Sequence, residues 1–545
     1  MKKHLENIRG LLTLWFVMLF LFSACVKEEF SLSKLDTTLN LDPALATPIG
    51  YFDFKIKENL QTSENAYISS NSDRIVSLYY CGEIVSEPAR KLFSFDPVNE
   101  SLSIPNPKRG IIDLSKDSYQ FEILARIPFF LSNSGANAEL DSIVLSSGIL
   151  RISEIVFPEA IGQVRIVIPG LKLNGKSFQV DLNSYDNFIF SEINEYTLGL
   201  TSEEERKNLI DVKIYFDFPR QPNILFASIP LLSFDFQIIA QEWETIYGYL
   251  GRDTFDFGRV SFSTNIKENF PGGEFYSIKP TLTFKTHNSY AVPLAMRLSN
   301  IIAQTEESGE ILLMGEGIPE PPNYFFPAYP EAPMNLEVAR DSFVINTANS
   351  NLDEITTSSP TRIDYGVEFF INPENRKVNN IVFSESSFLT KVELQLPFHG
   401  SAKLLSVKDT MRFDFSQLNI PVDEMIDQVI FKLYYENTFP AEIDLQLYLA
   451  DENLEVTDTL FKSVKKVKPA KPVDDFLEEY DFVSGEMEAF LSGTELQKIR
   501  DTRFIIGEAL LSTNENYNVV KIFDNQYLFL NIGIVFDIMT SIEDF

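Results

Sequence analysis

Apolar and polar residues alternate along many short stretches of the chain. A period of two places the apolar side chains on one face of a strand and the polar ones on the other. Turn-forming residues separate these stretches, without the helices of about a dozen residues that a parallel sheet would need between its strands. The sequence therefore predicts an all-β fold of tandem antiparallel β-sandwich domains with a few short helices. The alternating stretches are Tyr51–Lys57, Gly162–Pro169, Asp211–Phe218, Thr281–Thr286, Tyr365–Asn372, Lys391–Phe398, Met411–Phe415, Glu442–Leu449 and Tyr527–Met539.

Two short helices are predicted between these strands. Ser202 is a good N-terminal cap because Glu205 follows three residues later, which is the spacing of a capping box. A second short helix is predicted to start near Thr494. Neither segment is long enough to form a layer of its own.

Two segments, Lys279–Ile301 and Asp427–Asp451, share a pattern. Each contains an alternating strand, an asparagine, a serine or threonine, an aromatic residue, a proline and a second alternating strand. Asn288 and Asn437 can leave the ladder to bond nearby backbone, and the following proline blocks further pairing. The pattern resembles the strand connection of late-embryogenesis-abundant proteins of the water-stress type, which implies β-sandwich hairpins. Two unrelated hairpins would show the same pattern, and this alternative stays open.

Repetition also helps to place domain boundaries. We predict a first β-sandwich region at 46–250, long enough for one or two domains, a second domain at 251–380 and a third at 381–545. The segment Gly317–Pro333 carries six prolines. Its composition is compatible with a segment that joins two domains and equally with an extended strap across one sandwich.

The segment 1–24 has the parts of a secretory signal peptide. Basic residues precede the apolar stretch Leu11–Phe22, and the small residues Ser23 and Ala24 follow it. A retained membrane-spanning helix is the alternative, but a span needs about 20 apolar residues and this stretch is shorter. The sequence therefore predicts export and removal of the segment.

The residues that end in Cys25 resemble the processing site of bacterial lipoproteins, whose cysteine is acylated and becomes the first residue of the mature protein. Phe22 departs from the pattern, which usually has a smaller aliphatic residue at that position. The resemblance implies that 25–45 is an acylated tether and that the chain's partner is a membrane. Two or more acyl chains would hold it there firmly, whereas one chain binds only marginally.

Lys27, Glu28 and Glu29 follow the cysteine closely. They resemble the signal that sends lipoproteins of Bacteroidota to the outside of the outer membrane. With Leu41–Gly50 and the closing strand, the layout is similar to a large, mostly uncharacterised class of surface-exposed lipoproteins of that group. The resemblance implies a lipid-anchored outer-membrane protein at the cell surface and implies no activity. A solvated, charged tether is the alternative interpretation of the three charges.

The chain is strongly acidic, with a formal net charge of −32 at pH 7. It would repel nucleic-acid phosphates, so no nucleic-acid partner is expected. The one concentrated basic stretch, between Lys462 and Lys471, indicates an exposed loop or strand end. Cys25 and Cys81 are the two cysteines, so no disulfide within the chain is expected once Cys25 is acylated. The apolar, aromatic neighbours of Cys81 favour a buried, inert thiol.

Residues for catalysis or metal binding are scarce. His287 and His399 are far apart and lack the spacing of a zinc site, so we predict no metal and no cofactor. Motifs of serine hydrolases and nucleotide-binding loops are missing. A glycosidase needs two carboxylates about 5 to 10 Å apart, and so acidic a sequence cannot single out a pair. We expect no enzyme activity, and a glycan-active hydrolase or a glycan-binding accessory protein is kept as an alternative.

Trp243 is the one tryptophan after the signal peptide, and Tyr247 and Tyr249 follow it closely. Because flat aromatic faces stack on sugar rings, these residues are the candidate ligand platform, with a packed cluster as the alternative. The phenylalanines are expected mainly in the core. We predict a non-catalytic binding or structural role toward a protein or glycan partner. Another alternative is a fimbria-like subunit in which Tyr527–Met539 pairs with a neighbouring subunit by strand addition.

Overall fold

The computed structural model describes the chain between residues 45 and 538, with internal gaps. The predicted signal peptide 1–24, Cys25, Lys27, Glu28 and Glu29 lie outside the described residues. The described ranges are 45–60, 62, 66–85, 88–107, 112–132, 137–158, 161–183, 185–202, 204–222, 224–225, 230–270, 273–374, 377–413, 426–473, 480–492, 495, 499, 501–513 and 519–538.

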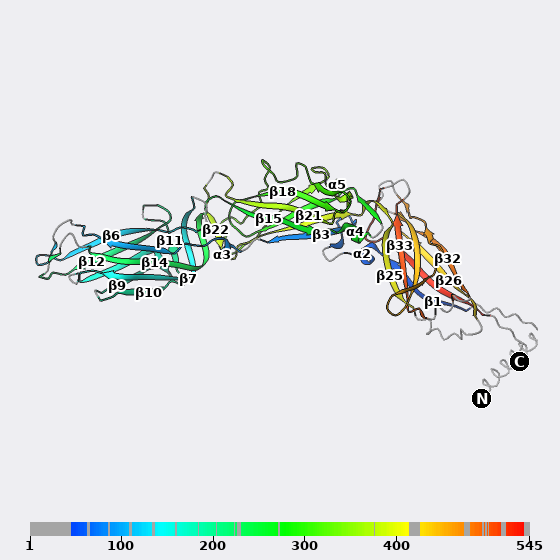
Figure 1. Cartoon of the computed structure of the whole chain (residues 1–545), viewed down its shortest axis with the longest axis horizontal. Coiled ribbons are helices and arrows are strands. Elements are labelled where there is room, and N and C mark those ends of the chain that lie inside the picture. Colours follow the sequence, from blue (N-terminus) through cyan, green and yellow to red (C-terminus); the bar gives the residue numbers. More distant parts are fainter. Residues whose placement is uncertain are drawn as a thin grey trace, which may run out of the picture.

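Antiparallel β-sheets form almost all of the regular structure, and the helices among the described residues are short. Three β-sandwich lobes follow one another along an elongated molecule (Figure 1). We call them the proximal lobe, which holds both the first and the last described strand, the middle lobe and the distal lobe. The predicted all-β fold of antiparallel sandwiches with a few short helices is confirmed.

The proximal lobe is a sandwich of two sheets. Its elements are β1 (Leu45–Phe54), α2 (Ile56–Asn59), β25 (Leu405–Arg412), β26 (Ile426–Asn437), β27 (Glu442–Ala450), β28 (Val456–Thr459), β29 (Lys465–Val467), β30 (Lys471–Pro472), β31 (Tyr480–Asp481), β32 (Val483–Ser492), β33 (Phe504–Ser512) and β35 (Leu528–Ile538). One sheet has the order β1-β35-β26-β32 and the other β25-β33-β27-β28. Phe52 and Phe54 are fully buried between them. A Cβ on Gly507 would lie 2.6 Å from the Phe54 ring, so glycine permits this close approach of the sheets.

The middle lobe is built in the same way. Its elements are β2 (Ala66–Ser70), β3 (Val76–Val85), β15 (Asp253–Ser263), α4 (Ile266–Asn269), β17 (Thr281–Asn288), β18 (Leu294–Thr305), β19 (Gly309–Leu312), β20 (Ala339–Asn346), α5 (Leu352–Thr357), β21 (Arg362–Ile371) and β23 (Phe388–Pro397). The sheets have the orders β2-β3-β23-β17-β20 and β15-β21-β18-β19. Phe284 of one sheet meets Tyr365 of the other edge to face, with 5.8 Å between ring centroids. Next in the chain, β24 (His399–Lys403) pairs with β16 (Glu274–Ser277) and β34 (Val520–Lys521).

The distal lobe folds one long sheet into two layers. Its elements are α3 (Ala89–Leu92), β4 (Val98–Ile104), β5 (Ile112–Asp113), β6 (Tyr119–Pro128), β7 (Glu139–Val156), β8 (Gln163–Leu173), β9 (Lys176–Leu182), β10 (Phe188–Glu192), β11 (Thr197–Gly199), β12 (Leu209–Phe218), β13 (Ile224–Leu225), β14 (Leu232–Tyr249) and β22 (Asn380–Phe383). The short β11 pairs with both β7 and β8 and so joins the layers β10-β7-β14-β4 and β9-β8-β12-β6. Buried Ile152 and Phe236 of the first layer, with Ile166 and Phe216 of the second, belong to the hydrophobic core.

The three lobes are nested in the chain. After β1 the chain enters the middle lobe, then builds the distal lobe, and returns through the middle lobe to the proximal one. Strand pairing consequently joins distant segments: β1 pairs with β35, β3 with β23, and β22 with β14. These pairings cross the contiguous ranges 46–250, 251–380 and 381–545, because alternation reveals a strand but not its partner.

The middle and proximal lobes repeat one plan. The strands β3, β15, β17, β18, β19, β20, β21 and β23 occupy the same sheet positions, in the same chain order, as β1, β25, β26, β27, β28, β32, β33 and β35. The two segments that share the asparagine-to-proline pattern are equivalent in this plan. They are not hairpins as predicted, because β17 and β18 lie in opposite sheets, as do β26 and β27. Each connection is an arch from one sheet to the other.

The two arches also repeat their hydrogen bonds. Asn288 and Asn437 are fully buried. The Oδ1 atom of Asn288 accepts the backbone N–H of Tyr290 at 3.0 Å, and that of Asn437 accepts the N–H of Phe439 at 2.9 Å. Each Nδ2 donates to a carbonyl of a more distant segment, at 3.1 Å for Ala328 and 2.8 Å for Lys468. The prediction that these asparagines bond nearby backbone is confirmed.

A hydroxyl group completes each arch. The Ser289 hydroxyl donates to the Ser387 carbonyl and accepts the Ser387 N–H, at 3.0 and 2.8 Å. The Thr438 hydroxyl makes the same two bonds with Tyr527, at 2.9 and 2.7 Å. Ser387 and Tyr527 directly precede β23 and β35, so each arch is fastened to the strand beside it. The shared pattern therefore marks one structural unit used twice.

The helix predicted at Ser202 is wrong. The Ser202 Oγ accepts the N–H of Arg206 at 3.0 Å, and its own N–H donates to the Arg206 carbonyl at 2.8 Å. Glu205 has a φ of +62°, outside the helical region. A turn between β11 and β12 thus uses the serine that the sequence assigns to a cap. Thr494, the predicted start of the other helix, lies outside the described residues.

Candidate functional site

The proline-rich segment Gly317–Pro333 is a strap across the middle sandwich. It is not a segment that joins two domains, which is the other interpretation of its composition. The Met296 N–H of β18 donates to the Phe325 carbonyl at 2.7 Å, and the Phe325 N–H donates back at 3.2 Å. The Leu298 N–H donates to the Pro319 carbonyl at 2.9 Å. The strap therefore covers part of the free edge of β18, where proline, which lacks an N–H, is tolerated.

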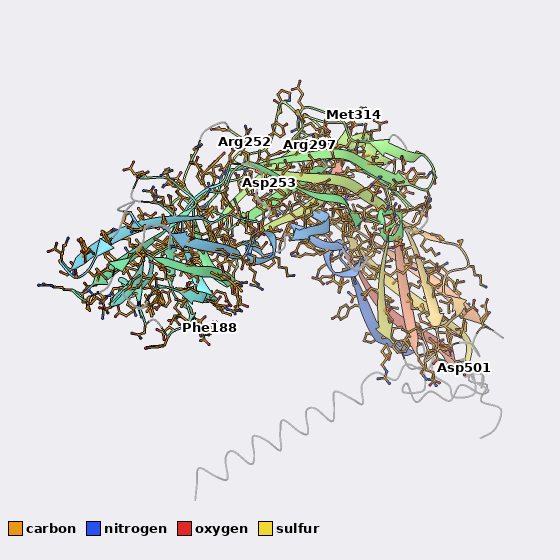
Figure 2. The ribbon with its side chains drawn as sticks, turned by 60° about the vertical axis from the view of Figure 1, so that its left-hand side comes forward. Phe188, Arg252, Asp253, Arg297, Met314 and Asp501 are labelled. Carbon is orange, nitrogen blue, oxygen red and sulfur yellow. The ribbon has the colours of Figure 1, made fainter. Side chains whose placement is uncertain are left out.

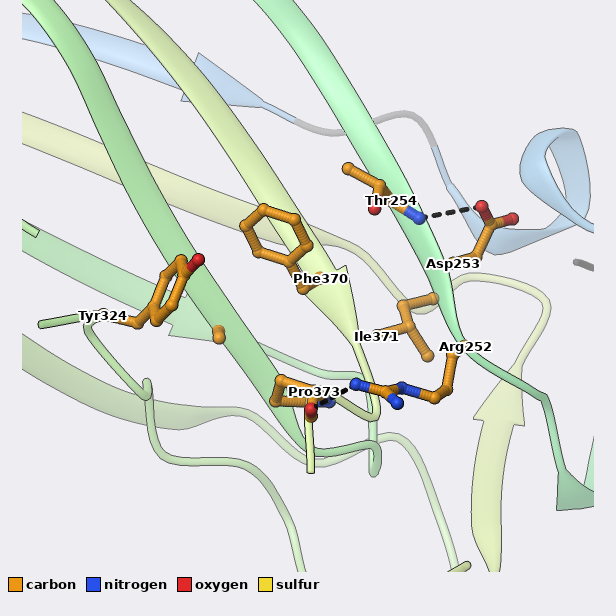
Figure 3. A pocket seen from close by; sticks show the side chains of 8 residues that line it. Arg252, Asp253, Thr254, Tyr324, Phe370, Ile371 and Pro373 are labelled. Atoms are coloured by element: carbon orange, nitrogen blue, oxygen red, sulfur yellow. Dashed lines mark hydrogen bonds between the residues drawn. The ribbon is translucent and has the colours of Figure 1, made fainter. Parts of the chain in front are cut away.

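Two adjoining hollows lie beside this strap and share Pro373, and we call them together the strap groove. Their volumes are about 330 and 400 Å³. Figure 3 shows the first hollow from close by. It is lined by Arg252, Asp253, Thr254, Ala295, Tyr324, Phe370, Ile371 and Pro373. The second is lined by Pro293, Leu294, Phe326, Pro327, Ala328, Tyr329, Glu331, Asn372, Pro373, Glu374 and Val378.

Rings and prolines give the strap groove apolar walls. Tyr324 of the strap meets Phe370 of β21 edge to face, with 5.5 Å between centroids. Phe326, farther along the strap, keeps 55% of its surface exposed beside the second hollow. A concave surface with aromatic walls and a few polar groups is the usual form of a binding site.

Charged groups stand at the rim of the groove. The Arg252 Nη2 donates to the Pro373 carbonyl at 2.7 Å, which lays the side chain across the end of β21 (Figure 3). The Asp253 carboxylate accepts the N–H of Thr254 at 2.7 Å. Glu331 and Glu374 are exposed in the second hollow. This set can orient a ligand, and it includes neither histidine nor cysteine.

The floor of the groove is held by a buried amide pair. Asn372 and Asn380, each about 1% exposed, bond through both amides at 2.9 and 3.2 Å. Asn372 also donates to the Gly251 carbonyl at 2.7 Å, and Asn380 accepts the Leu250 N–H at 3.0 Å. Because Leu250 and Gly251 follow β14, this pair fastens the distal lobe to the middle lobe beneath the groove.

The candidate platform residues Trp243, Tyr247 and Tyr249 are largely buried, which favours their alternative interpretation as a packed cluster. Trp243 is 6% exposed and its Nε1 donates to the Phe93 carbonyl at 3.1 Å, while Tyr249 is 7% exposed. Tyr247 is half-buried. Residues from Trp243 onward pack at the base of the distal lobe, where the β14–β7 ladder is irregular on both sides of Trp243. These rings belong to a packed cluster, and sequence reasoning missed the strap groove because its walls come from separate segments.

His287 lies at the end of β17 and His399 at the start of β24. Burial, with the charges of Lys521 and Lys279, lowers the pKa of His399, so this imidazole is neutral at pH 7. Across the ranges that the structure describes, no cluster of three or more His, Cys, Asp or Glu could hold a metal ion.

Cys81 lies on β3 and is exposed, so the expectation of a buried thiol is wrong. Partial desolvation of the thiol, and then the charge of Glu393, raise its pKa, so the thiol stays protonated near neutral pH. In the lysine-rich stretch, Lys466 pairs with Glu442 and Asp444, and Lys462 with Glu495. These lysines are thus already engaged with the chain's own carboxylates.

Within the described part of the chain, no helix is long and apolar enough to cross a membrane.

The strand proposed for addition to a neighbouring subunit is not free. β35 lies inside its sheet, with β1 along one edge and β26 along the other. Its Leu530, Ile534 and Phe536 are fully buried. The fimbria-like interpretation of Tyr527–Met539 therefore fails for the part of this strand that the structure describes, because its backbone partners lie within the same chain.

Three solved structures show distant similarity to this chain. A protein described as secreted, from Parabacteroides distasonis, is 14% identical with a TM-score of 0.27, over 54% of this chain and 88% of that one. A structure of infectious bursal disease virus, Gx strain, is 9% identical with a TM-score of 0.14, over 82% of this chain and 81% of that one. The major capsid protein P2 of bacteriophage PM2 is 12% identical with a TM-score of 0.11, over 52% of this chain and 99% of that one. No family model and no curated protein matches the chain. The resemblances to bacterial lipoproteins and late-embryogenesis-abundant proteins therefore stay predictions.

Proposed function

We propose that this chain is a lipid-anchored protein of the bacterial outer membrane, exposed at the cell surface, with a non-catalytic binding role. The anchor is Cys25, and Lys27, Glu28 and Glu29 direct the protein to the outside of that membrane. The acidic charge of −32 suits a soluble ectodomain that does not adhere to anionic lipid.

The order of the lobes is the observation that carries the proposal. β1 begins at Leu45, directly after the predicted tether, and pairs with β35 in the proximal lobe. Because the other lobes are nested between these two strands, the distal lobe lies at the opposite extremity (Figure 1). An anchor at Cys25 would keep the proximal lobe near the bilayer and hold the rest of the molecule away from it.

The strap groove supports binding as the role of this ectodomain. Its aromatic and proline walls offer apolar contact, and Arg252 with the rim carboxylates can fix the orientation of a ligand. Its floor is held by the Asn372–Asn380 pair, so the groove is formed before a ligand arrives. A glycan-active hydrolase has no comparable observation in its favour.

The test replaces one cysteine at a time in cells that make the full chain. We expect wild-type protein and Cys81→Ala to incorporate a labelled fatty acid and to sediment with outer membranes. Cys25→Ala should lose the label and appear in the soluble fraction, because no acyl chain remains to hold it. Labelled, membrane-bound Cys25→Ala protein would refute the anchor, and Cys81→Ala controls for the loss of a thiol elsewhere.

A further inference from the structure

The two layers of the distal lobe present different outer faces. On the β9-β8-β12-β6 layer, opposite charges pair across neighbouring strands: Arg165 with Asp181 at 2.6 Å, and Lys213 with Glu122 at 3.4 Å. Such exposed pairs are ordinary for a solvated sheet face. That face also carries one exposed ring, Tyr215 of β12, whereas the outer face of the β10-β7-β14-β4 layer carries two exposed phenylalanine rings side by side among polar side chains.

Two phenylalanines form the aromatic part of this face. Phe188 and Phe190 of β10 are 49% and 51% exposed, although the sequence predicts most phenylalanines in the core. Their ring centroids are 6.4 Å apart and their planes differ by 20°, so the two rings present nearly parallel flat surfaces. Figure 2 shows Phe188 at the outer surface of the distal lobe. The exposed half of each ring gains no stabilisation from burial within the chain.

The strand register places polar residues beside the rings in two rows. One row continues from Phe190 through Arg151, Gln237 and Asn99, and the other from Phe188 through Ser153, Asp235 and Ser101. The Gln237 amide donates to the Asn99 Oδ1 at 2.6 Å. The Ser101 hydroxyl donates to the Asp235 carboxylate at 2.6 Å. These bonds fix the polar groups before any ligand binds.

Arg151 connects the two parts of the face. Its guanidinium lies over the Phe188 ring, with 5.0 Å from Cζ to the ring centroid. Among the described residues this is its one recorded interaction, and no carboxylate pairs with it. Its N–H groups are therefore available as donors next to the Phe188 ring.

We propose that this surface, formed by Phe188, Phe190, Arg151, Gln237, Asn99, Asp235 and Ser101, binds a glycan chain. Sugar rings have an apolar face that packs on a flat aromatic ring, and hydroxyl groups that bond to amides, carboxylates and guanidinium. The face supplies both, on neighbouring strands of one sheet. A protein partner would need a larger apolar centre than two rings bordered by polar rows. The inference stands apart from the strap groove and does not depend on the anchor.

The experiment compares wild-type full chain with the double variant Phe188→Ala/Phe190→Ala. Soluble xylan, starch, β-mannan and mucin O-glycans serve as probes in calorimetric titrations. We expect wild-type protein to bind at least one probe, and the double variant to raise that Kd about tenfold or more through the loss of two stacking rings. Arg151→Ala should weaken the same binding by a smaller factor.

A matched control is Phe490→Ala, which removes a similarly exposed ring from the proximal lobe, 47% exposed on β32. It should leave the affinity unchanged, and all variants should keep the wild-type thermal unfolding midpoint because these rings lie at the surface. Wild-type protein that binds none of the four probes would overturn the proposal. So would a double variant that binds the probes with the same affinity as wild type.

Discussion

At the scale of single residues, the buried asparagines of the two arches show how far a local pattern reaches. The sequence identifies Asn288 and Asn437 as residues that bond nearby backbone, because an asparagine amide does so within its own turn. It does not reveal that each amide also bonds a distant carbonyl, or that the strands on either side enter opposite sheets. Those features depend on segments far away in the chain.

We predict that Asn437→Ala lowers the free energy of unfolding by about 2 to 4 kcal/mol. The substitution leaves the Phe439 N–H and the Lys468 carbonyl without the partner that the buried Asn437 amide supplies. Chemical denaturation of the full chain measures the change. Asn453→Ala, at an exposed position of the same lobe, should stay within about 0.5 kcal/mol of wild type. Equal unfolding curves for the two variants would disprove the role of the arch amide.

Aromatic residues show the limit of sequence reasoning at this scale. Trp243, a residue of the candidate platform, is buried, whereas Phe188 and Phe190 are exposed although the phenylalanines are expected mainly in the core. Alternation separates the two faces of a strand but does not tell which face is covered. Covering depends on the sheet that packs opposite, and along β14 the irregular ladder also breaks the count of alternate residues.

At the scale of elements, periodicity predicts the strands well and their partners poorly. Most alternating stretches are strands in the structure, from β1 to β35. The pairing of β1 with β35 joins the two ends of the described chain, and the arches replace the predicted hairpins. The proline-rich segment is a strap because its partner, β18, has an edge to cover. Domain boundaries drawn along the sequence, which treat each domain as one unbroken segment, cannot contain these pairings between distant segments.

We predict that the proximal sheet depends on β1. A chain that starts at residue 55 loses the buried rings of Phe52 and Phe54, each worth about 3 to 5 kcal/mol, and leaves one edge of β35 unpaired. Hydrogen exchange should show rapid exchange in β35 and unchanged protection in β12 of the distal lobe. A chain that starts at residue 45 keeps β1 and is the control. Full protection of β35 in the shorter chain would contradict the prediction.

At the scale of the whole molecule, the sequence predicts the fold class and proposes a location, and the structure adds an order in space. Nesting places the first and last described strands in one lobe and the glycan-binding surface proposed for β10 in the lobe at the other extremity (Figure 1). The strap groove lies between them, next to the junction of the middle and distal lobes. Neither surface could be predicted, since each is assembled from strands that are far apart in the chain.

The central claim is that the anchored chain holds its distal lobe outside the cell. The most direct measurement is antibody binding to an epitope inserted after Gly175, in the β8–β9 turn, where added atoms meet nothing within 4 Å. The account predicts binding to intact cells, undiminished without permeabilisation. Binding that arises only after the outer membrane is opened would contradict it.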